Sequence, residues 1–518
     1  MTENSERAEV AQQMSHSTSS PNSQSAASTR HDVEHGASTV EGEKGASGTA
    51  AEEKDANLVS WDVDADSRNP LAWSTAKRWT ILMIVSTCSL CVTCTSSVVS
   101  STFESLESEF RIGHEVAILG LSLFVLGLGI GPLALAPLSE FYGRRPVYLS
   151  SFGLFVLLGL PVSFANNPAV FFIFRFLTGV FGSAFLSVAG GTVADLFLPK
   201  DMALPMAAYT MSPFLGPILG PLYAGFATYF STWRWTFWTI NIWSFIMWIA
   251  LLLFVPETFH PTILTTKAKH LRRSTGNADL CSAHELKLRE KSIGGTLRAN
   301  STKVIQLLIL EPMLALLCLW TALLLGILYL FFEAFPIVFR THGFNLWQTG
   351  LSFLGLAVGL ILGAFTMPYW AGRYRRAMAE NGGQAPPEAR LPMAMVAAIL
   401  NPISLFWFAF TTYPAVHWSV PIVASIPFGA GILFTYSAVF SYTADVWRPV
   451  AASALGANSI SRSLFACVFP LFATQMYARL GNAGATALLA GLNVLMVPIP
   501  FIFAKYGPQL RAKSRYSY

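Results

Sequence analysis

Long apolar runs dominate the chain, and they come in two groups of six separated by one polar stretch. Each run holds about 20 residues, the length that an α-helix needs to cross the hydrocarbon core of a bilayer. The pattern predicts an all-α polytopic membrane protein with twelve transmembrane helices in two pseudo-symmetric six-helix bundles. The runs lie near residues 79–100, 114–138, 146–165, 168–196, 203–227 and 234–255, and then near 312–338, 347–370, 392–412, 418–444, 450–477 and 484–504.

Polar segments frame these two bundles. Residues 1–60 are rich in Ser, Thr, Glu and Ala and almost free of aromatic side chains, which predicts a disordered N-terminal tail. The tail lacks the apolar core of a signal peptide, so we expect insertion to rely on the first span. The remaining boundaries that we predict are an N-terminal bundle at 61–255, a linker loop at 256–311, a C-terminal bundle at 312–504 and a tail at 505–518.

Composition agrees with a membrane protein. The chain is 53% hydrophobic and 12% charged, whereas soluble domains carry about 25% charged residues. Cys88, Cys91 and Cys94 recur at a spacing of three, but no His or carboxylate lies near enough to complete a metal site, so we interpret them as helix-packing residues. No disulfide, metal, nucleotide or prosthetic group is expected, and no nucleic-acid partner.

Lys and Arg gather on one side of the predicted membrane, together with both chain ends and the linker loop. The other side has Arg111, Arg234, Arg340 and Arg479. Because basic residues collect in cytoplasmic loops, this asymmetry predicts cytosolic N and C termini. We expect a multi-pass protein of the plasma membrane, with an internal membrane left as an alternative.

The two groups of spans also repeat each other. Span four ends in Thr192–Phe197, TVADLF, and span ten ends in Tyr442–Trp447, YTADVW. The turn Gly143–Arg145 after span two recurs in degraded form at Gly372–Arg376 after span eight. Parallel six-span repeats with a binding site between them are the layout of alternating-access transporters.

Several motifs resemble one family. The run Ala136–Arg145, APLSEFYGRR, resembles the loop 2–3 signature of the major facilitator superfamily, with Ala136 and Glu140 departing from it. Arg175 with Gly179, and Pro256-Glu257-Thr258 after span six, are similar to further motifs of that superfamily. The sequence FFEAFP at Phe331–Pro336 and the run from Arg448 look like the twelve-span drug:proton antiporters of fungi. The resemblance implies the major facilitator fold and the exchange of a small organic molecule for protons.

Span five carries a Gly/Pro pattern that resembles the antiporter signature of this superfamily. Small residues allow close helix approach, and internal prolines remove backbone donors and bend a helix. We interpret the pattern as a tight, deformable seam between the bundles, with ordinary helix packing as the alternative. The seam residues are Gly216, Pro217, Gly220, Pro221 and Gly225.

Charged residues at the cytosolic ends of spans two and four form a second candidate feature. We predict that Glu140, Arg144, Arg145 and Asp195 make a latch that holds the inner gate closed. Solvated residues that only fix the topology are the alternative.

Glu333, Arg175 and Arg462 fall inside predicted spans, where ionisable groups are functional candidates. Glu333 can gain or lose a proton when its surroundings change, so Glu333 and Arg175 are our proton-coupling candidates. Arg462 is a candidate for the substrate cavity. The other cavity candidates are polar or aromatic residues in span interiors, namely Asn458, Tyr209, Asn241, Asn401, Tyr436 and Tyr442. Two arginines and one carboxylate suit neutral amphipathic or anionic cargo.

Other classes of protein fit less well. A haem or metal oxidoreductase needs His ligands within spans, and the nine His lie in tails, loops or span edges. An ATP-driven pump needs a phosphate-binding loop of the Walker type, which is absent from the sequence. We therefore predict a non-enzymatic secondary transporter that exports a small organic molecule in exchange for protons as a monomer in the lipid bilayer. A proton-coupled importer and a non-transporting receptor or scaffold remain the alternatives.

Overall fold

The computed structural model describes residues 57–61, 66–198, 201–289, 292–383 and 385–516. The predicted disordered tail at 1–60 therefore lies outside the described residues, except for its last four positions. This short stretch contacts the linker. Leu58 pairs with Cys281 as a single β-bridge, and the amide of Val59 donates to the Cys281 carbonyl at 2.9 Å.

Helices make up the regular structure of the described residues, apart from that one bridge. The first half contains α2 (Thr75–Ser97), α3 (Phe103–Phe110), α4 (His114–Ile130), α5 (Pro132–Tyr142), α6 (Arg144–Ser163), α7 (Pro168–Gly182), α8 (Ala184–Ser187), α9 (Ala189–Leu196), α10 (Ala203–Phe230) and α11 (Trp233–Phe254). The linker contains α12 (His260–Thr275), α13 (Ala283–Arg289) and α14 (Ile293–Leu310). The second half contains α15 (Pro312–Arg340), α16 (Leu346–Ser352), α17 (Leu354–Glu380), α18 (Leu391–Phe410), α19 (Ser419–Ala424), α20 (Ile426–Val446), α21 (Ala451–Met496) and α22 (Pro498–Lys513).

These helices account for the twelve predicted spans. Ten helical segments of the described residues are long and apolar enough to cross a membrane. The last of them, Ala451–Lys513, is 63 residues long, and it holds two spans because the backbone turns at Gly481, whose φ is 69°. The twelfth span is α10, whose 28 residues are long enough to cross but carry glycines and prolines of low hydropathy.

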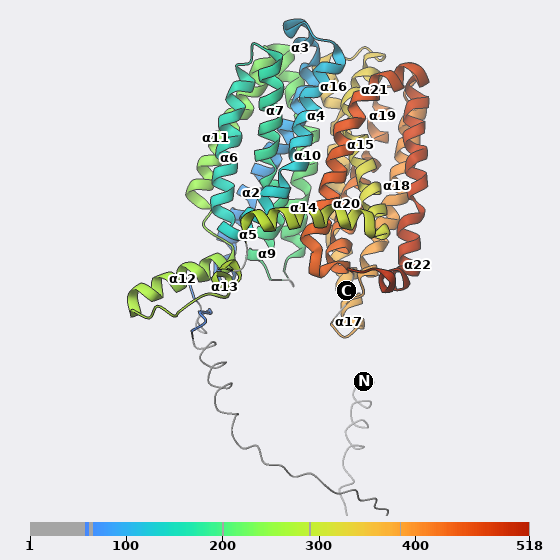
Figure 1. Cartoon of the computed structure of the whole chain (residues 1–518). Helices are drawn as coiled ribbons and strands as arrows, with labels where there is room; N and C mark the ends of the chain where they lie inside the picture. The colour runs from blue at the N-terminus through green and yellow to red at the C-terminus, as the bar shows by residue number, and fades with distance from the viewer. Residues whose placement is uncertain (1–56, 62–65, 199–200, 290–291, 384, 517–518) are drawn as a thin grey trace, which may run out of the picture. The chain divides into compact units, whose positions relative to one another are not determined.

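The spans form two halves with matching internal packing. Figure 1 shows the helices of residues 75–254 on one side of the molecule and those of residues 312–513 on the other. In the first half α2 packs on α10 and α4 on α7, and in the second half α15 packs on α21 and α17 on α20. The corresponding spans are thus one and five, two and four, seven and eleven, eight and ten, as a parallel six-span repeat requires.

The linker lies at one end of the two halves. In Figure 1, α14 runs across the transmembrane helices near the end where α12 and α13 lie, and α3 and α16 lie at the opposite end. We call these the linker end and the far end. The halves meet along two lines, with α4 against α21 and α10 against α16 and α17.

Backbone-to-backbone approach within each half depends on glycine. A Cβ atom on Gly179 of α7 would lie 2.1 Å from the carbonyl oxygen of Phe124 on α4. A Cβ atom on Gly359 of α17 would lie 2.0 Å from the carbonyl oxygen of Ile426, which begins α20. Gly179 and Gly359 place two equivalent pairs of helices, spans two and four and spans eight and ten, closer than any larger residue permits.

The predicted Gly/Pro seam divides into two parts. A Cβ atom on Gly216 or Gly220 would clash with Thr93 or Ser97 of α2 in the same half. Gly225 instead faces the other half, where a Cβ atom would lie 3.0 Å from the Leu346 carbonyl oxygen. Pro217 and Pro221 lie inside α10 without ending it. The inter-bundle part of the seam is therefore at the far end, around Gly225.

One sequence repeat has a different local structure from the one expected. Gly372–Arg376, read as a degraded copy of the turn at Gly143–Arg145, lies inside α17, which continues to Glu380. Gly143 has φ of +100° and makes a true turn, whereas Gly372 is helical. The second half therefore turns later in the chain than the first.

The close approach at Gly359 predicts a stability effect. Gly359→Ala should lower the stability of the purified protein by about 1–3 kcal/mol, because the backbone of α20 cannot move aside cheaply. Thermal unfolding in detergent measures the change. Gly491→Ala is the matched control, since a Cβ at that helical glycine meets no atom within 4 Å, and equal unfolding midpoints for the two variants would contradict the packing argument.

Candidate functional site

A chain of three ionisable side chains crosses from one half to the other at the far end. Glu333 on α15 is 5% exposed, and its Oε2 lies 3.1 Å from Nε2 of His114, the first residue of α4. The other ring nitrogen of His114, Nδ1, lies 2.5 Å from Oε1 of Glu107 on α3. The second carboxyl oxygen of Glu333 is buried without a hydrogen-bond partner among the described residues. One proton-coupling candidate thus lies at the interface between the halves.

Further polar contacts join the halves near these three residues. Arg340 of α15 pairs with Glu104 of α3, and the side-chain amide of Gln475 on α21 donates to Glu115 of α4. Deeper inside, the hydroxyls of Ser96 and Tyr329 are 2.8 Å apart. The direct hydrogen bonds and ion pairs between the halves, as far as the described residues show them, lie toward the far end, so that end is closed.

Arg175, the other proton-coupling candidate, is held entirely within the first half. It is 1% exposed and donates to the carbonyl oxygens of Gly120, Thr95 and Ser96 at 2.9, 3.0 and 3.3 Å. Its guanidinium also lies 4.5 Å from the centre of the Phe124 ring. Arg175 therefore fastens α7 to α4 and to the end of α2, with its charge directed at backbone carbonyls.

Arg462 on α21 has a different environment. Its guanidinium lies 5.4 Å from the Tyr436 ring and 5.1 Å from the Phe440 ring. Its Nε is buried without a hydrogen-bond partner among the described residues. Tyr436 in turn packs against Phe214 of the first half, with ring centres 4.5 Å apart. Arg462 thus lies beside the interface between the halves.

The remaining cavity candidates make bonds within one half. Asn458 donates to the Thr321 hydroxyl at 2.7 Å, and the Tyr209 hydroxyl donates to the Phe185 carbonyl at 2.9 Å. Asn241 donates to the Gly159 carbonyl at 2.9 Å and borders, with Arg175, an internal cavity of about 10 Å³, near the smallest space that holds one water.

Asn401 and Tyr442 lie away from the interface between the halves. Asn401 joins α18 to α20 through the Thr435 hydroxyl at 3.3 Å, and the Tyr442 hydroxyl lies 3.8 Å from the sulfur of Met313 on α15. Both side chains are fully buried. Their observed contacts are those of helix packing inside the second half.

At the linker end, Arg144 begins α6 and is the centre of a second charged cluster. Its Nε lies 3.2 Å from Oδ2 of Asp195 at the end of α9, and its guanidinium lies 4.5 Å from the Phe259 ring. Glu257 accepts from the backbone amides of Arg144, Arg145, Thr258 and Phe259 at 2.9 to 3.1 Å. A carboxylate at a helix N-terminus is favourable because the first amides there have no partner within the helix.

Three of the four residues predicted to form the latch make contacts, and these contacts lie within the first half. Arg145 donates to the Leu252 carbonyl at 3.1 Å, so Arg144, Arg145 and Asp195 tie together the ends of spans three, four and six. Glu140 is exposed and makes no hydrogen bond or ion pair with a described residue. A Cβ on Gly143 would lie 2.4 Å from Glu257, which explains the glycine at this turn.

The second half has an equivalent cluster made from other residues. Asp445, which matches Asp195 in the repeat, pairs with Arg390 at 3.1 Å, directly before α18. Arg390 also lies 3.5 Å from the centre of the Tyr374 ring. Glu388 pairs with Arg511 at the end of α22 at 3.0 Å. The sequence pattern does not single out Arg390, because the copy of the turn that it predicts is at Gly372–Arg376, inside α17.

His114, Glu107 and Glu257 were also missed as site residues. His114 was set aside because it stands at a span edge, and its contacts with α3 and α15 depend on tertiary structure. Glu257 belongs to the motif Pro256-Glu257-Thr258, but the motif does not show which backbone amides the Glu257 carboxylate accepts from.

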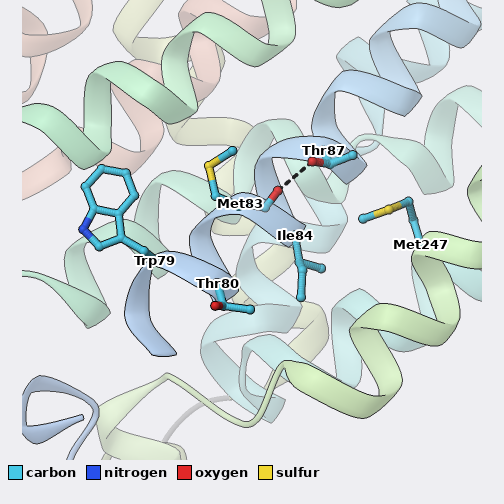
Figure 2. Close-up of a pocket in the computed structure, with 6 residues that line it drawn as sticks. All are labelled: Trp79, Thr80, Met83, Ile84, Thr87 and Met247. Carbon is cyan, nitrogen blue, oxygen red and sulfur yellow. Dashed lines mark hydrogen bonds between the residues drawn. The ribbon is translucent and has the colours of Figure 1, made fainter. Parts of the chain in front are cut away.

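A larger groove lies on the outside of the first half, between α2 and α11. It has a volume of about 370 Å³ and is lined by Trp79, Thr80, Met83, Ile84, Thr87 and Met247 (Figure 2). The Thr87 hydroxyl donates to the Met83 carbonyl of its own helix at 2.8 Å. The Thr80 hydroxyl donates to the Ala76 carbonyl at 2.9 Å. Because both hydroxyls are bonded within their own helix, the groove offers an apolar surface of the kind that faces hydrocarbon.

The described residues hold no group of three His, Cys, Asp or Glu that could bind a metal ion.

The capping role of Glu257 predicts a difference between two neighbouring carboxylates. Glu257→Gln should lower the free energy of unfolding by about 1–3 kcal/mol, because an amide oxygen replaces a charged acceptor of four amides. Glu140→Gln, the matched control, should leave it unchanged, as measured by thermal unfolding in detergent. A larger loss of unfolding free energy in the Glu140 variant than in the Glu257 variant would contradict the capping role of Glu257.

Comparison with known proteins identifies the family. The model of the Major Facilitator Superfamily matches residues 85–470. The relative named Efflux pump atB, from Aspergillus terreus, is 43% identical over 467 residues, covering 89% of this chain and 90% of that protein. The Probable drug/proton antiporter YHK8 of Saccharomyces cerevisiae is 39% identical over 468 residues, covering 90% of this chain and 91% of the relative. A structure of the proton:xylose symporter XylE shares the fold, with a TM-score of 0.60 and 16% identity over 84% of this chain and 96% of that one. The chain belongs to the Major Facilitator Superfamily, and it is an integral membrane transporter.

Proposed function

We propose that this transporter exports a small organic molecule in exchange for protons by alternating access between its two halves. The observation that carries the proposal is Glu333, a buried carboxylate bonded across the interface between the halves. A group there changes its surroundings whenever the halves move, and a carboxylate can therefore take up and release a proton in step with the motion. The relatives named as an efflux pump and a drug/proton antiporter support the same direction of transport.

The halves proposed to move are the bundles at 61–255 and 312–504, joined by the linker at 256–311. The proposal places the linker end and both chain termini in the cytosol, since the basic residues gather on that side of the membrane. The far end then faces outward, and the observed contacts correspond to a state closed to the outside. We place the protein in the plasma membrane and expect one chain to transport alone.

Arg462 is the residue proposed to contact the cargo. Its guanidinium rests beside the Tyr436 and Phe440 rings, with a buried Nε that no described residue bonds. An unbonded buried donor is costly, and a carboxylate or carbonyl oxygen of the cargo would satisfy it. Arg175 is directed at backbone carbonyls instead, so we assign it to holding the first half together. This arrangement favours an amphipathic cargo with an acceptor group.

The inner cluster of Arg144, Arg145 and Asp195 is proposed to keep the ends of spans three, four and six fixed as one body. Its contacts lie within the first half, so it stiffens the moving part beside the inner gate. The part of the seam around Gly225 is proposed as the pivot at the far end, because the backbones of α10 and α16 approach closely there.

Glu333 should be required for proton-driven export. Host cells that lack their own pumps of this family would be loaded with fluorescein, an anionic dye, or Nile red, a neutral one. Cells with the wild-type chain should retain less dye, and the difference should grow as the medium is acidified, whereas Glu333→Gln should remove this dependence. Glu104→Gln, in an exposed pair, is the control. Accumulation of dye instead of loss would favour an importer.

Arg462 should distinguish the two dyes. Arg462→Gln should reduce fluorescein export about tenfold, the effect of losing one charged hydrogen bond worth roughly 1.5 kcal/mol, and should reduce Nile red export less, because a neutral carbonyl oxygen accepts a weaker hydrogen bond than a carboxylate. Arg479→Gln, an exposed arginine on the same helix, should export both dyes normally. Equal loss of both dyes in the Arg462 variant would assign this residue to the fold instead of the cargo site.

A further inference from the structure

We infer that Glu107, His114 and Glu333 form a single proton-binding site whose protonated form closes the outer end of the transporter. The inference rests on the proposed proton exchange and adds to it two residues, Glu107 and His114, and a mechanical role. His114 then acts as a positioning residue and proton carrier between solvent and the buried carboxylate.

The hydrogen-bond geometry fixes the number of protons in the site. Both ring nitrogens of His114 lie within bonding distance of carboxyl oxygens, at 2.5 and 3.1 Å. A neutral imidazole has one N–H and one lone pair, while an ionised carboxylate only accepts. A neutral ring between two ionised carboxylates has one N–H and can make only one of the two bonds. Both bonds therefore require one additional proton in the site. We assign this arrangement to the protonated form of the site, written as an imidazolium between Glu107 and Glu333.

Exposure falls from the His114 ring to the Glu333 carboxyl group, which is the direction that a proton from outside must travel. The His114 and Glu107 side chains are 37% and 29% exposed, and that of Glu333 is 6% exposed. Water at the outer surface can therefore reach the ring, while Glu333 is reached through the ring. The edge of His114 also packs on the Phe103 ring at 5.9 Å between centres, which keeps it in place.

The surrounding charges leave these three groups as the ones that share the proton. Glu107 of α3 and Glu333 of α15 are the titratable groups that contact the ring. Among the other charged side chains on the packed elements, Glu104 pairs with Arg340, Glu115 accepts from Gln475, Glu109 pairs with Arg234 and Arg175 binds backbone carbonyls. Arg111 after α3 and Arg479 on α21 are exposed, and Arg462 lies beside the Tyr436 and Phe440 rings. The hydroxyls of Tyr329 and Tyr477 lie 2.8 Å from those of Ser96 and Thr486.

Proton transfer within the site explains how its occupancy controls the outer end. When the Nε2–H bond of the imidazolium breaks and the proton joins Oε2 of Glu333, both groups become neutral, and Nδ1–H still donates to Glu107. When Glu333 then releases that proton toward the inside, its carboxylate faces the lone pair of Nε2. The bond lost is the one between the halves, because the bond to Glu107 lies within the first half. A proton bound from outside therefore closes the outer end, and its release inside allows that end to open.

Closure can be measured without any cargo. Cysteines placed by Glu104→Cys and Arg340→Cys would report closure of the outer end through a short bis-maleimide crosslinker, using the purified full chain between about pH 6 and pH 8.5. That replaced pair is exposed and contributes little to closure. Because the closed form binds one more proton, its ratio to the open form should rise up to tenfold for each unit that the pH falls.

Variants of His114 separate a proton site from a structural residue. His114→Gln should leave the crosslinking independent of pH, and His114→Arg, always charged, should keep it high throughout. A merely structural histidine would not give opposite results with these two replacements. His342→Gln is the matched control, because His342 lies at the same end of α15 and its Nδ1 bonds the Val338 carbonyl of its own helix; it should behave as the wild type.

The outcomes distinguish this inference from the proposed function. Crosslinking that depends on pH in the wild type but not in His114→Gln supports the proton site, even where dye export fails and the antiport proposal falls. Crosslinking that is independent of pH in the wild type overturns the inference, even where dye export is driven by protons. Loss of the pH dependence in His342→Gln would also overturn it.

Discussion

Every charge buried between these helices must find its partner inside the protein, because the hydrocarbon of a bilayer offers none. The three intramembrane charges solve this in different ways. Arg175 uses three backbone carbonyls of its own half, so its bonds persist whatever the other half does. Glu333 uses a histidine of the opposite half, so its bond exists only while the far end is closed. Arg462 keeps a buried Nε that no described residue bonds. The proposed exchange uses them as a fixed charge, a charge that switches and a charge left for a ligand.

Helix packing supplies the rigidity that such a division requires. Gly179 and Gly359 bring equivalent helices into backbone contact inside each half, and the clusters around Arg144 and Arg390 tie helix ends together within each half. The direct hydrogen bonds and ion pairs that the described residues make between the halves lie toward the far end, where Ser96 meets Tyr329 and Arg340 meets Glu104. Exposed ion pairs contribute little stability, because water can replace each partner. The backbones of α10 and α16 also approach closely between the halves, so the halves are joined both by polar contacts and by packed backbones.

The sequence was sufficient for the features that depend on composition and period. Apolar runs located the twelve spans, and the matched Ala-Asp pairs located the repeat. These runs included α10, although its glycines and prolines lower its hydropathy. The sequence could not show which neighbouring helix each residue faces. Gly216 and Gly225 belong to one motif, yet two and a half turns of helix point them at different neighbours. For the same reason His114 remained a residue at a span edge until α3 and α15 brought carboxylates to both of its nitrogens.

The two linker-end clusters show what the repeat preserves. In the first half a carboxylate from the end of span six, Glu257, binds the start of span three. In the second half the carboxylate is Glu388, before span nine, and the cation is Arg511, at the end of span twelve. The partners have exchanged the ends from which they come, while the same helix ends remain joined. The architecture thus requires that these helix ends are joined, and it does not require particular residues. A half that moves as one body needs its third and sixth helices fastened, whether the carboxylate comes from the third helix or from the sixth.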